Sequence, residues 1–390
     1  MKKLDNTHKN GIAGAVSEGG TPSLGTIAKS SPTLQKRRRE LYDLLRKIRA
    51  IYLSAGTAEG LDLPTKFHRT SLCKHACAGS GGVEVNLLQK AGRAFYKGLQ
   101  TCGSVWTCPI CANKIQEIRR QEIAHGMKYF YGLGKQAVMI TFTFPHEKKQ
   151  ALKDLLDQFK EALKLLRKGG TFTRRCKDFD YSGLIRSLEI THGQKGWHPH
   201  THELWFMSAS VDEEEFKKFI LAKWFDACKK AGLIAENKEK AFLEHSIDVR
   251  FNCSTSDYLA KFDDSNNWGI DREMAKASSK KGKKAGRHPF ALADENEDAL
   301  FLEYTKAIKG TAQIYWSPGL KKTVNIEELS DEEAAELEGE DDLKIVGMIP
   351  KRLWFTVTKK ELRANVLELA EEEKDISFIR SFVFAESKNE

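Results

Sequence analysis

The chain has 390 residues, of which 63 are Lys or Arg and 54 are Asp or Glu, so its formal net charge is +9. This length excludes a single small scaffold and leaves room for two or three compact units. No run approaches the ~18 consecutive apolar residues of a membrane span, and the polar N-terminus lacks the apolar core of a secretory signal, so we expect a cytoplasmic protein without a membrane partner.

The first 60 residues predict a tail followed by a basic helix. Residues 1–33 are rich in Gly, Ser, Thr and Lys without a sustained period, which is typical of a flexible tail. Residues 34–52 carry the run Lys36–Arg39 and apolar residues at helical spacing, namely Leu41, Leu44, Leu45 and Ile48. The positive charge of this helix suits a polyanionic partner such as DNA. A charged face that is only solvated and does not bind DNA fits the pattern equally well.

Cysteines are concentrated in the next segment, where five of the eight lie between Cys73 and Cys111. Disulfides are rare in the cytosol, so the clustering calls for another explanation. The spacing Cys102-x5-Cys108-x2-Cys111, with Cys73 and Cys77 upstream, is typical of a structural zinc site. One alternative is a thioredoxin-like redox pair, but that motif belongs in a βαβ setting. The other alternative is a set of buried thiols that bind no metal. Four ligands are needed and five cysteines are available.

The clearest periodic patterns lie between residues 137 and 262. They predict strands over 137–144, 183–191, 200–207 and 245–251, and helices over 152–166, from a capping box at Ser210 and Glu213 to Gly232, and over 254–262. The order β-α-β-β-α-β is the ferredoxin-like split βαβ arrangement. We therefore expect an α+β fold with an antiparallel sheet, preceded by the Cys-rich zinc-binding module.

The string His198-Pro199-His200-Thr201-His202 is the most informative in the chain. Residues two apart on a strand point to the same side, so His200 and His202 share one face of the sheet. If residues 192–197 close a hairpin, Glu189 lies opposite His200. Two imidazoles and a carboxylate with open positions suit a catalytic Mg²⁺, Mn²⁺ or Zn²⁺ ion. A lone histidine would more often be structural.

A nucleophile is available on the helix that follows the last strand. Tyr258 and Lys261 are three residues apart and share a helical face. A nearby ammonium and a metal-bound phosphate both favour the phenolate. The pair is weak evidence alone, and Tyr181, Tyr304 and Tyr315 compete for the role.

Several strings together resemble plasmid and phage rolling-circle replication initiators of the HUH endonuclease superfamily. His200-Thr201-His202 resembles the His-hydrophobe-His motif, although Thr201 is less apolar than that name suggests. Four further strings are similar to motifs of this family, namely residues 140–145 (ITFTFP), 258–262 (YLAKF), 102–111 (CGSVWTCPIC) and 316–320 (WSPGL). The resemblance covers roughly residues 70–325.

This resemblance implies a site-specific single-strand DNA endonuclease that acts at an origin. Tyr258 would attack a phosphodiester, keep the 5′ end as a phosphotyrosine and release a 3′-OH primer. His200, His202 and Glu189 would hold Mg²⁺ or Mn²⁺. The zinc ligands implied by the family pattern are Cys73, Cys102, Cys108 and Cys111, with Cys77 as the substitute for Cys73.

The implied partners are single-stranded and origin DNA, a host DNA polymerase and a host helicase, since the chain has no G-x-x-x-x-G-K-[ST] string. A homodimer is left open. Some family members carry a glutamate one turn before the tyrosine to activate water at termination. This chain has Ser254 there, with Asp257 and Glu273 as substitutes, so the termination chemistry stays open.

Three alternatives remain: an HUH relaxase or transposase with the same residues, a non-catalytic zinc-bearing DNA-binding protein, and a metallohydrolase that uses water. The predicted organisation has four parts. Residues 1–60 form the basic tail and helix, 61–130 the zinc-binding module, 131–325 the HUH endonuclease domain, and 326–390 an acidic linker and C-terminal segment.

Overall fold

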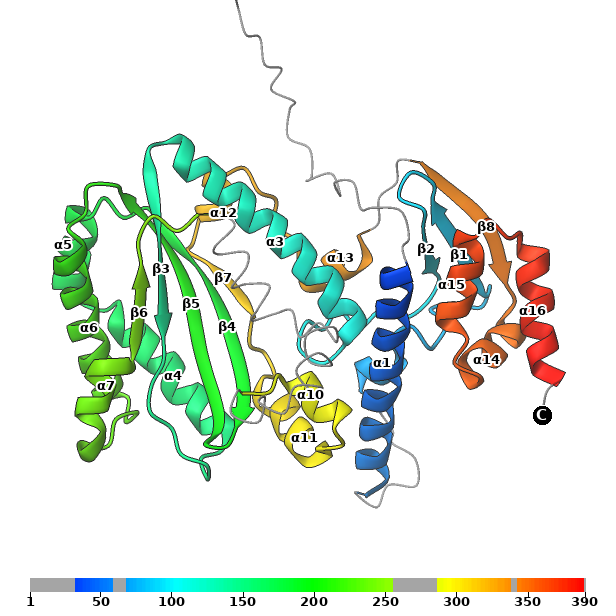
Figure 1. Cartoon of the computed structure of the whole chain (residues 1–390), viewed down its shortest axis with the longest axis horizontal. Helices are drawn as coiled ribbons and strands as arrows, with labels where there is room; N and C mark the ends of the chain where they lie inside the picture. Colours follow the sequence, from blue (N-terminus) through cyan, green and yellow to red (C-terminus); the bar gives the residue numbers. More distant parts are fainter. Residues whose placement is uncertain (1–31, 59–67, 255–285, 338–341, 389–390) are drawn as a thin grey trace, which may run out of the picture.

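The computed structural model describes residues 32–58, 68–254, 286–337 and 342–388. Within them, two antiparallel sheets of five and three strands are packed against helices, and the long helices α1 (Pro32–Ala58) and α3 (Pro109–Gly132) run between the sheets (Figure 1). The predicted α+β class is confirmed. No described helix is both long and apolar enough to cross a lipid bilayer.

The larger sheet contains the four predicted strands and one more. Its strands are β3 (Lys135–Phe142), β4 (Gly183–Gly193), β5 (Gly196–Ser208), β6 (Ile247–Arg250) and β7 (Ile314–Trp316). The spatial order is β6-β3-β5-β4-β7, and each neighbouring pair is antiparallel. The short edge strand β7 comes from the Trp316 segment, which the periodicity did not predict as a strand.

Helices α4 (Leu152–Leu166), α5 (Gly170–Asp178) and α6 (Glu213–Lys230) cover one face of this sheet, followed by a 3₁₀ turn at Glu236–Lys238 and α7 (Glu239–His245). The predicted capping box at Ser210 was wrong. The N-cap of α6 is Asp212, whose carboxylate accepts the N–H of Glu215 at 2.7 Å, because the chain turns two residues later than expected. The predicted helix over 254–262 lies outside the described residues except for Ser254.

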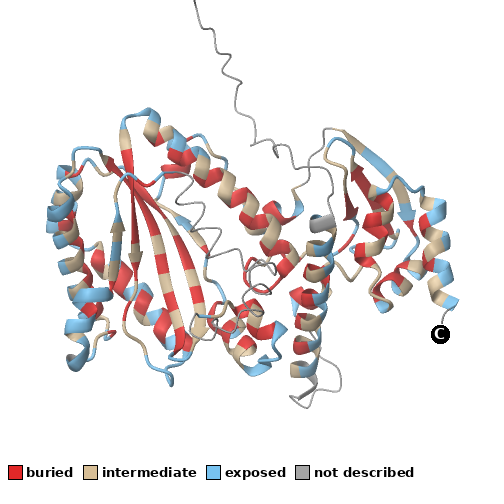
Figure 2. Ribbon diagram, in the orientation of Figure 1, coloured by how far each residue is buried: buried red, intermediate tan, exposed pale blue. Residues whose placement is uncertain are grey.

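Helix α3 covers one end of the opposite face. Its residues Ile123, Met127 and Phe130 pack against the sheet, and the rings of Phe130 and Phe206 stack with centroids 4.2 Å apart. Figure 2 shows the buried residues concentrated on the central strands and on the inner sides of the helices. The apolar half of this face is therefore buried under α3, while its other half carries the polar residues of β4 and β5.

The smaller sheet joins two segments that are far apart in the sequence. Strand β8 (Leu343–Ile349) pairs with β1 (Val83–Leu88), which pairs with β2 (Arg93–Lys97). Helices α14 (Lys351–Lys359), α15 (Arg363–Glu371) and α16 (Ile376–Lys388) pack on this sheet. The C-terminal segment is thus folded onto residues 83–97. The division of the chain at residues 60, 130 and 325 stays a prediction.

The basic run of α1 is largely engaged within the protein. Arg38 and Arg39 form ion pairs with Glu371 and Glu368 of α15, and Arg37 bonds the side chain of Asn113. These contacts hold the run against α3 and α15, and a role of the run in binding a polyanion stays a prediction.

The remaining short helices are α2 (Arg69–Leu72), α10 (Pro289–Asp294), α11 (Asp298–Ala307), α12 (Leu320–Thr323) and α13 (Asp331–Glu336). Helix α13 lies in the acidic segment, and Ser330 caps it through a capping box with Glu333.

Candidate functional site

The β4–β5 hairpin brings Glu189, His200 and His202 together. Glu189 stands directly opposite His200 in the register, so the two side chains share a face, and His202 follows on the same face two residues along β5. Glu189 Oε2 lies 2.9 Å from His200 Nε2 and 3.3 Å from His202 Nε2. One ligand atom from each of the three residues lies within 4.8 Å of the other two, which is compatible with one shared metal ion.

The three side chains are sheltered but reachable from solvent. Their exposed fractions are 15% for Glu189, 13% for His200 and 12% for His202. Burial by itself raises the pKa of Glu189, but the two imidazoles outweigh it and hold the pKa well below its ordinary value. A carboxylate and two imidazoles in this arrangement form a donor set that suits Mg²⁺, Mn²⁺ or Zn²⁺.

A neighbouring side chain and a backbone carbonyl orient the imidazoles. Thr141 is opposite His202 on β3, and its Oγ1 lies 3.0 Å from His202 Nδ1, the nitrogen that points away from Glu189. The Nδ1 of His200 lies 3.3 Å from the carbonyl oxygen of His198. Partners of this kind fix the ring orientation and the tautomer of metal-binding histidines.

A second pair of histidines extends the polar face. The Nδ1 atoms of His198 and His146 lie 3.1 Å apart, and His198 Nε2 lies 3.3 Å from Thr143 Oγ1. Burial and the nearby His200 lower the pKa of His198 to about 3. The alternation along β5 predicted that His198 lies beside the site. Sequence reasoning missed His146, because this residue follows β3 and is 52 positions from His198 in the chain.

Another residue missed by sequence reasoning is His288. An isolated bridge pairs His192 with Arg287, with N···O distances of 2.9 and 2.8 Å, so His288 enters next to the end of β4. Its Nδ1 accepts the N–H of Phe290 at 3.2 Å and caps α10, which leaves the proton on Nε2. Burial lowers the pKa of His288 to about 4, and the nearby charge of Glu189 opposes that shift. The basic loop before it gave no signal of this placement.

The proposed nucleophile Tyr258 and its neighbour Lys261 lie outside the described residues. The three competing tyrosines do not reach the Glu189 group. Tyr304 is fully buried, with its hydroxyl bonded to the Trp106 carbonyl. Tyr315 is opposite Arg186, on the sheet face away from Glu189, and Tyr181 packs on the ring of Trp205 on that same far face.

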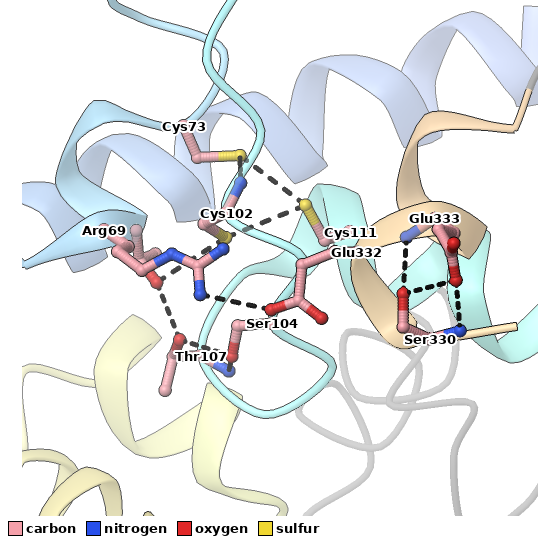
Figure 3. A network of polar contacts seen from close by, with 10 residues as sticks. Arg69, Cys73, Cys102, Ser104, Thr107, Cys111, Ser330, Glu332 and Glu333 are labelled. Atoms are coloured by element: carbon pink, nitrogen blue, oxygen red, sulfur yellow. Dashed lines mark hydrogen bonds and ion pairs between the residues drawn. The ribbon is translucent and has the colours of Figure 1, made fainter.

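The cysteines form a second, separate group. Cys73, Cys102, Cys108 and Cys111 are buried, and their sulfur atoms lie within 4.8 Å of one another. Cys77 is not a member of this group among the residues that the structure describes. Figure 3 shows Cys73, Cys102 and Cys111 pointing toward one another from separate segments.

Backbone N–H groups donate to two sulfurs of this group. Cys108 is the N-cap of α3, and its sulfur accepts the N–H of Cys111 at 3.5 Å. The sulfur of Cys73 accepts the N–H of Cys102 at 3.4 Å. Four convergent sulfurs with N–H donors fit a closed tetrahedral zinc site, which has no open position for a substrate.

Helix α13 packs against this cysteine group. Arg69 forms an ion pair of 3.1 Å with Glu332, which Figure 3 also shows, and a Cβ placed on Gly103 would lie 2.9 Å from the Glu332 Cα. Since Gly103 has a φ of +61°, a side chain there would be strained as well as crowded. The cysteine group therefore joins α2, α3 and the acidic segment.

Comparison with known proteins identifies the family of the chain. A family model described as "Replication protein" matches residues 95–363, and the chain belongs to this family. It is 26% identical to "Protein rep" of Streptomyces lividans over 355 residues, which covers 72% of this chain and 77% of that protein. This confirms the resemblance to plasmid replication proteins.

The chain is also 27% identical over 177 residues to the "Neomycin resistance protein" of Streptomyces cyanogenus, covering 36% of this chain and 40% of that protein. No solved structure matches the chain with significance.

Proposed function

We propose that this replication protein starts rolling-circle replication by nicking one DNA strand at its origin, with Tyr258 as the nucleophile and a divalent ion held by Glu189, His200 and His202. The observation that carries the proposal is the convergence of the carboxylate with the two imidazoles on one accessible sheet face. The host DNA polymerase would extend the new 3′-OH, and a host helicase would unwind the duplex.

The reaction is a transesterification. The Tyr258 oxygen forms a bond to the scissile phosphorus as the bond to the 3′ oxygen of the preceding nucleotide breaks, so the energy of the phosphodiester is kept in a 5′-phosphotyrosine. The phenol loses its proton, the ammonium of Lys261 stabilises the resulting phenolate, and the leaving 3′ oxygen takes up a proton to become the 3′-OH. When bound, Mg²⁺ or Mn²⁺ would polarise a non-bridging phosphate oxygen.

The anchoring of the segment that carries Tyr258 supports this assignment. Cys253 donates its N–H to the Ala137 carbonyl at 3.0 Å, on the sheet face that carries Glu189. At the other end of the segment, a Cβ on Gly286 would lie 2.6 Å from Thr191 Oγ1, again on that face.

Chain length also allows Tyr258 to reach the group. Ala137 is opposite Phe206, four residues from His202 or about 13 Å along the strand. The five residues from Cys253 to Tyr258 can span up to about 17 Å.

We further propose that the five-stranded sheet is a ferredoxin-like HUH core within residues 131–325. The order β6-β3-β5-β4 supports this assignment, because it follows from two crossed β-α-β units with antiparallel neighbours. The buried cysteine group supports structural Zn²⁺ in residues 61–130. Its ligands would be Cys73, Cys102, Cys108 and Cys111.

The test uses the full-length protein and single-stranded oligonucleotides from the origin of its own replicon, labelled at the 3′ end, with Mg²⁺ or Mn²⁺. The expected product is a labelled protein–DNA adduct, which Tyr258→Phe abolishes while oligonucleotide binding is retained. Tyr315→Phe is the matched control, because Tyr315 is partly exposed on the opposite face and should leave the adduct unchanged.

The outcomes separate the alternatives. Cleavage without an adduct would overturn the proposal in favour of hydrolysis by water. No cleavage of origin DNA in either metal, with binding intact, would favour a non-catalytic DNA-binding protein. Efficient cleavage of a transfer origin or a transposon end, and none at the replication origin, would favour a relaxase or transposase.

A further inference from the structure

The tip of the β4–β5 hairpin is packed directly onto the loop that follows β3. Gly196 has a φ of +86°, and a Cβ at this position would lie 2.9 Å from the Lys148 Cα and 3.1 Å from the Lys148 carbonyl oxygen. No L-amino acid other than glycine fits this turn without moving the loop. The two loops therefore form one continuous surface at the end of the sheet that carries the histidines.

This surface carries three lysines without an acidic partner. Lys148, Lys149 and Lys195 are exposed, and none forms an ion pair with the residues that the structure describes. The adjacent Glu147 is exposed and bonds Gln150 through its backbone N–H. By contrast, the nearby Arg287 is neutralised by Glu295 and Glu297. Three ammonium groups that form no ion pair with the described residues thus lie on two loops that meet at Gly196.

The His146–His198 pair connects these lysines with the Glu189 group. The rings of His198 and His200 are stacked with centroids 4.9 Å apart, and those of His146 and His198 lie 4.6 Å apart. Lys195 is close enough to His146 for its charge to act on that imidazole. Hydrogen-bonding and cationic groups therefore follow one another along one sheet face, from the hairpin tip to Glu189.

We propose that Lys148, Lys149 and Lys195, together with His146 and His198, bind the phosphates of a single DNA strand on one side of the scissile phosphodiester. This inference rests on the proposed function for the position of the cut. The partner is a polyanion because the surface is cationic and presents N–H and O–H groups. A single strand fits the site because the neighbouring rings of His146, His198 and His200 lead to side chains that are only 12–15% exposed, and the bases of a paired strand would hinder the approach of its backbone to them.

The first experiment measures binding of a single-stranded oligonucleotide without added Mg²⁺ or Mn²⁺, so that the strand stays whole, at several salt concentrations. Each phosphate contact on a single strand contributes about 0.7 to the slope of log K against log salt. The variant Lys148→Ala/Lys149→Ala/Lys195→Ala should therefore lower the slope by about 2. The matched control Lys177→Ala/Lys218→Ala/Lys230→Ala removes the same charge from exposed positions on α5 and α6, and should leave the slope unchanged.

The second experiment locates the contacts with oligonucleotides that carry a neutral methylphosphonate at one linkage at a time. The wild-type protein should lose affinity at linkages on one side of the cleavage position, and the lysine variant should show no further loss there. His146→Gln should reduce the penalty at the linkage nearest the cut on that side.

Equal slopes for the lysine variant and the wild type would overturn the inference, as would an equal loss in the control. Penalties spread over both sides of the cut, or a lysine effect seen with duplex and absent with single strands, would overturn it too. The nicking proposal is tested independently, because adduct formation by Tyr258 is measured with a divalent metal and the binding of the oligonucleotide is measured without one.

Discussion

Glu189 and His200 are cross-strand partners in the β4–β5 hairpin, and the carboxylate oxygen lies 2.9 Å from the imidazole Nε2. The same oxygen also faces His202, so a single carboxylate links both histidines. This relationship makes Glu189 the residue on which metal binding should depend most.

Replacing Glu189 by Gln should weaken Mn²⁺ binding strongly, because the substitution removes the negative charge and keeps the size of the side chain. Loss of an outer partner of a metal ligand typically costs about 10–100-fold in affinity, so loss of the ligand itself should cost at least that much. Titration of Mn²⁺ followed by electron paramagnetic resonance measures the change. Glu147→Gln removes an exposed acid that does not belong to the group, and this variant should bind Mn²⁺ like the wild type. An equal loss in both variants would contradict the assignment.

Substitution of Cys102 by Ser should release zinc and destabilise the fold. The four cysteines join α2, α3 and the loop between them, so an effect of about 3 kcal/mol would lower the Tm of this 390-residue chain by roughly 4 °C. Zinc content by mass spectrometry and a thermal melt measure both. Cys77→Ser is the matched control and should retain one zinc per chain; zinc loss in that variant would show that Cys77 is the ligand in place of Cys73.

Stability should fall on acidification partly through His288. Its pKa is lowered to about 4 by burial, so below the ordinary value of about 6.5 the unfolded chain takes up a proton that the folded chain does not. The loss begins as pH falls through 6.5, continues to about pH 4, and is at most on the order of 3 kcal/mol.

His288→Gln should therefore be less sensitive to a change from pH 7.5 to pH 5, measured as the free energy of unfolding in urea. His245→Gln is the control, because its side chain is 80% exposed. A wild-type pH dependence that His288→Gln leaves unaltered would argue against this origin.

The ion pair of Arg38 with Glu371 should hold the C-terminal unit against α1. The Glu371 side chain is only 2% exposed, and its carboxylate also accepts the N–H of Ala94 at 2.9 Å. Arg38→Ala removes the guanidinium from this buried carboxylate, and removing one partner of a buried pair costs about 3–5 kcal/mol.

The measurement is the free energy of unfolding, with Arg46→Ala as the control. Arg46 pairs with Asp43 at the surface, where such pairs contribute about 0–1 kcal/mol. If Arg38→Ala instead left stability unchanged and weakened DNA binding, the basic run of α1 would have to be interpreted as a DNA contact.

Sequence patterning was sufficient for the features that depend on local backbone geometry. The strands over 137–144, 183–191 and 200–207 were predicted because alternation has a period of two, and that period also placed Glu189 on the face of His200. The cysteine set from the family resemblance coincides with the four sulfurs that converge in the structure. Tyr258 stays a prediction from the sequence and from the anchoring of its segment.

Only the tertiary structure decided which distant segments meet. Strand β8 pairs with β1, Arg38 meets a glutamate 333 positions away, and His146 and His288 join the histidine face from separate loops. Periodicity fixes the direction of a side chain relative to its own strand or helix, because it follows from backbone sterics over a few residues. The choice of partner segment depends on burying apolar surface over the whole chain, and no local pattern contains that information.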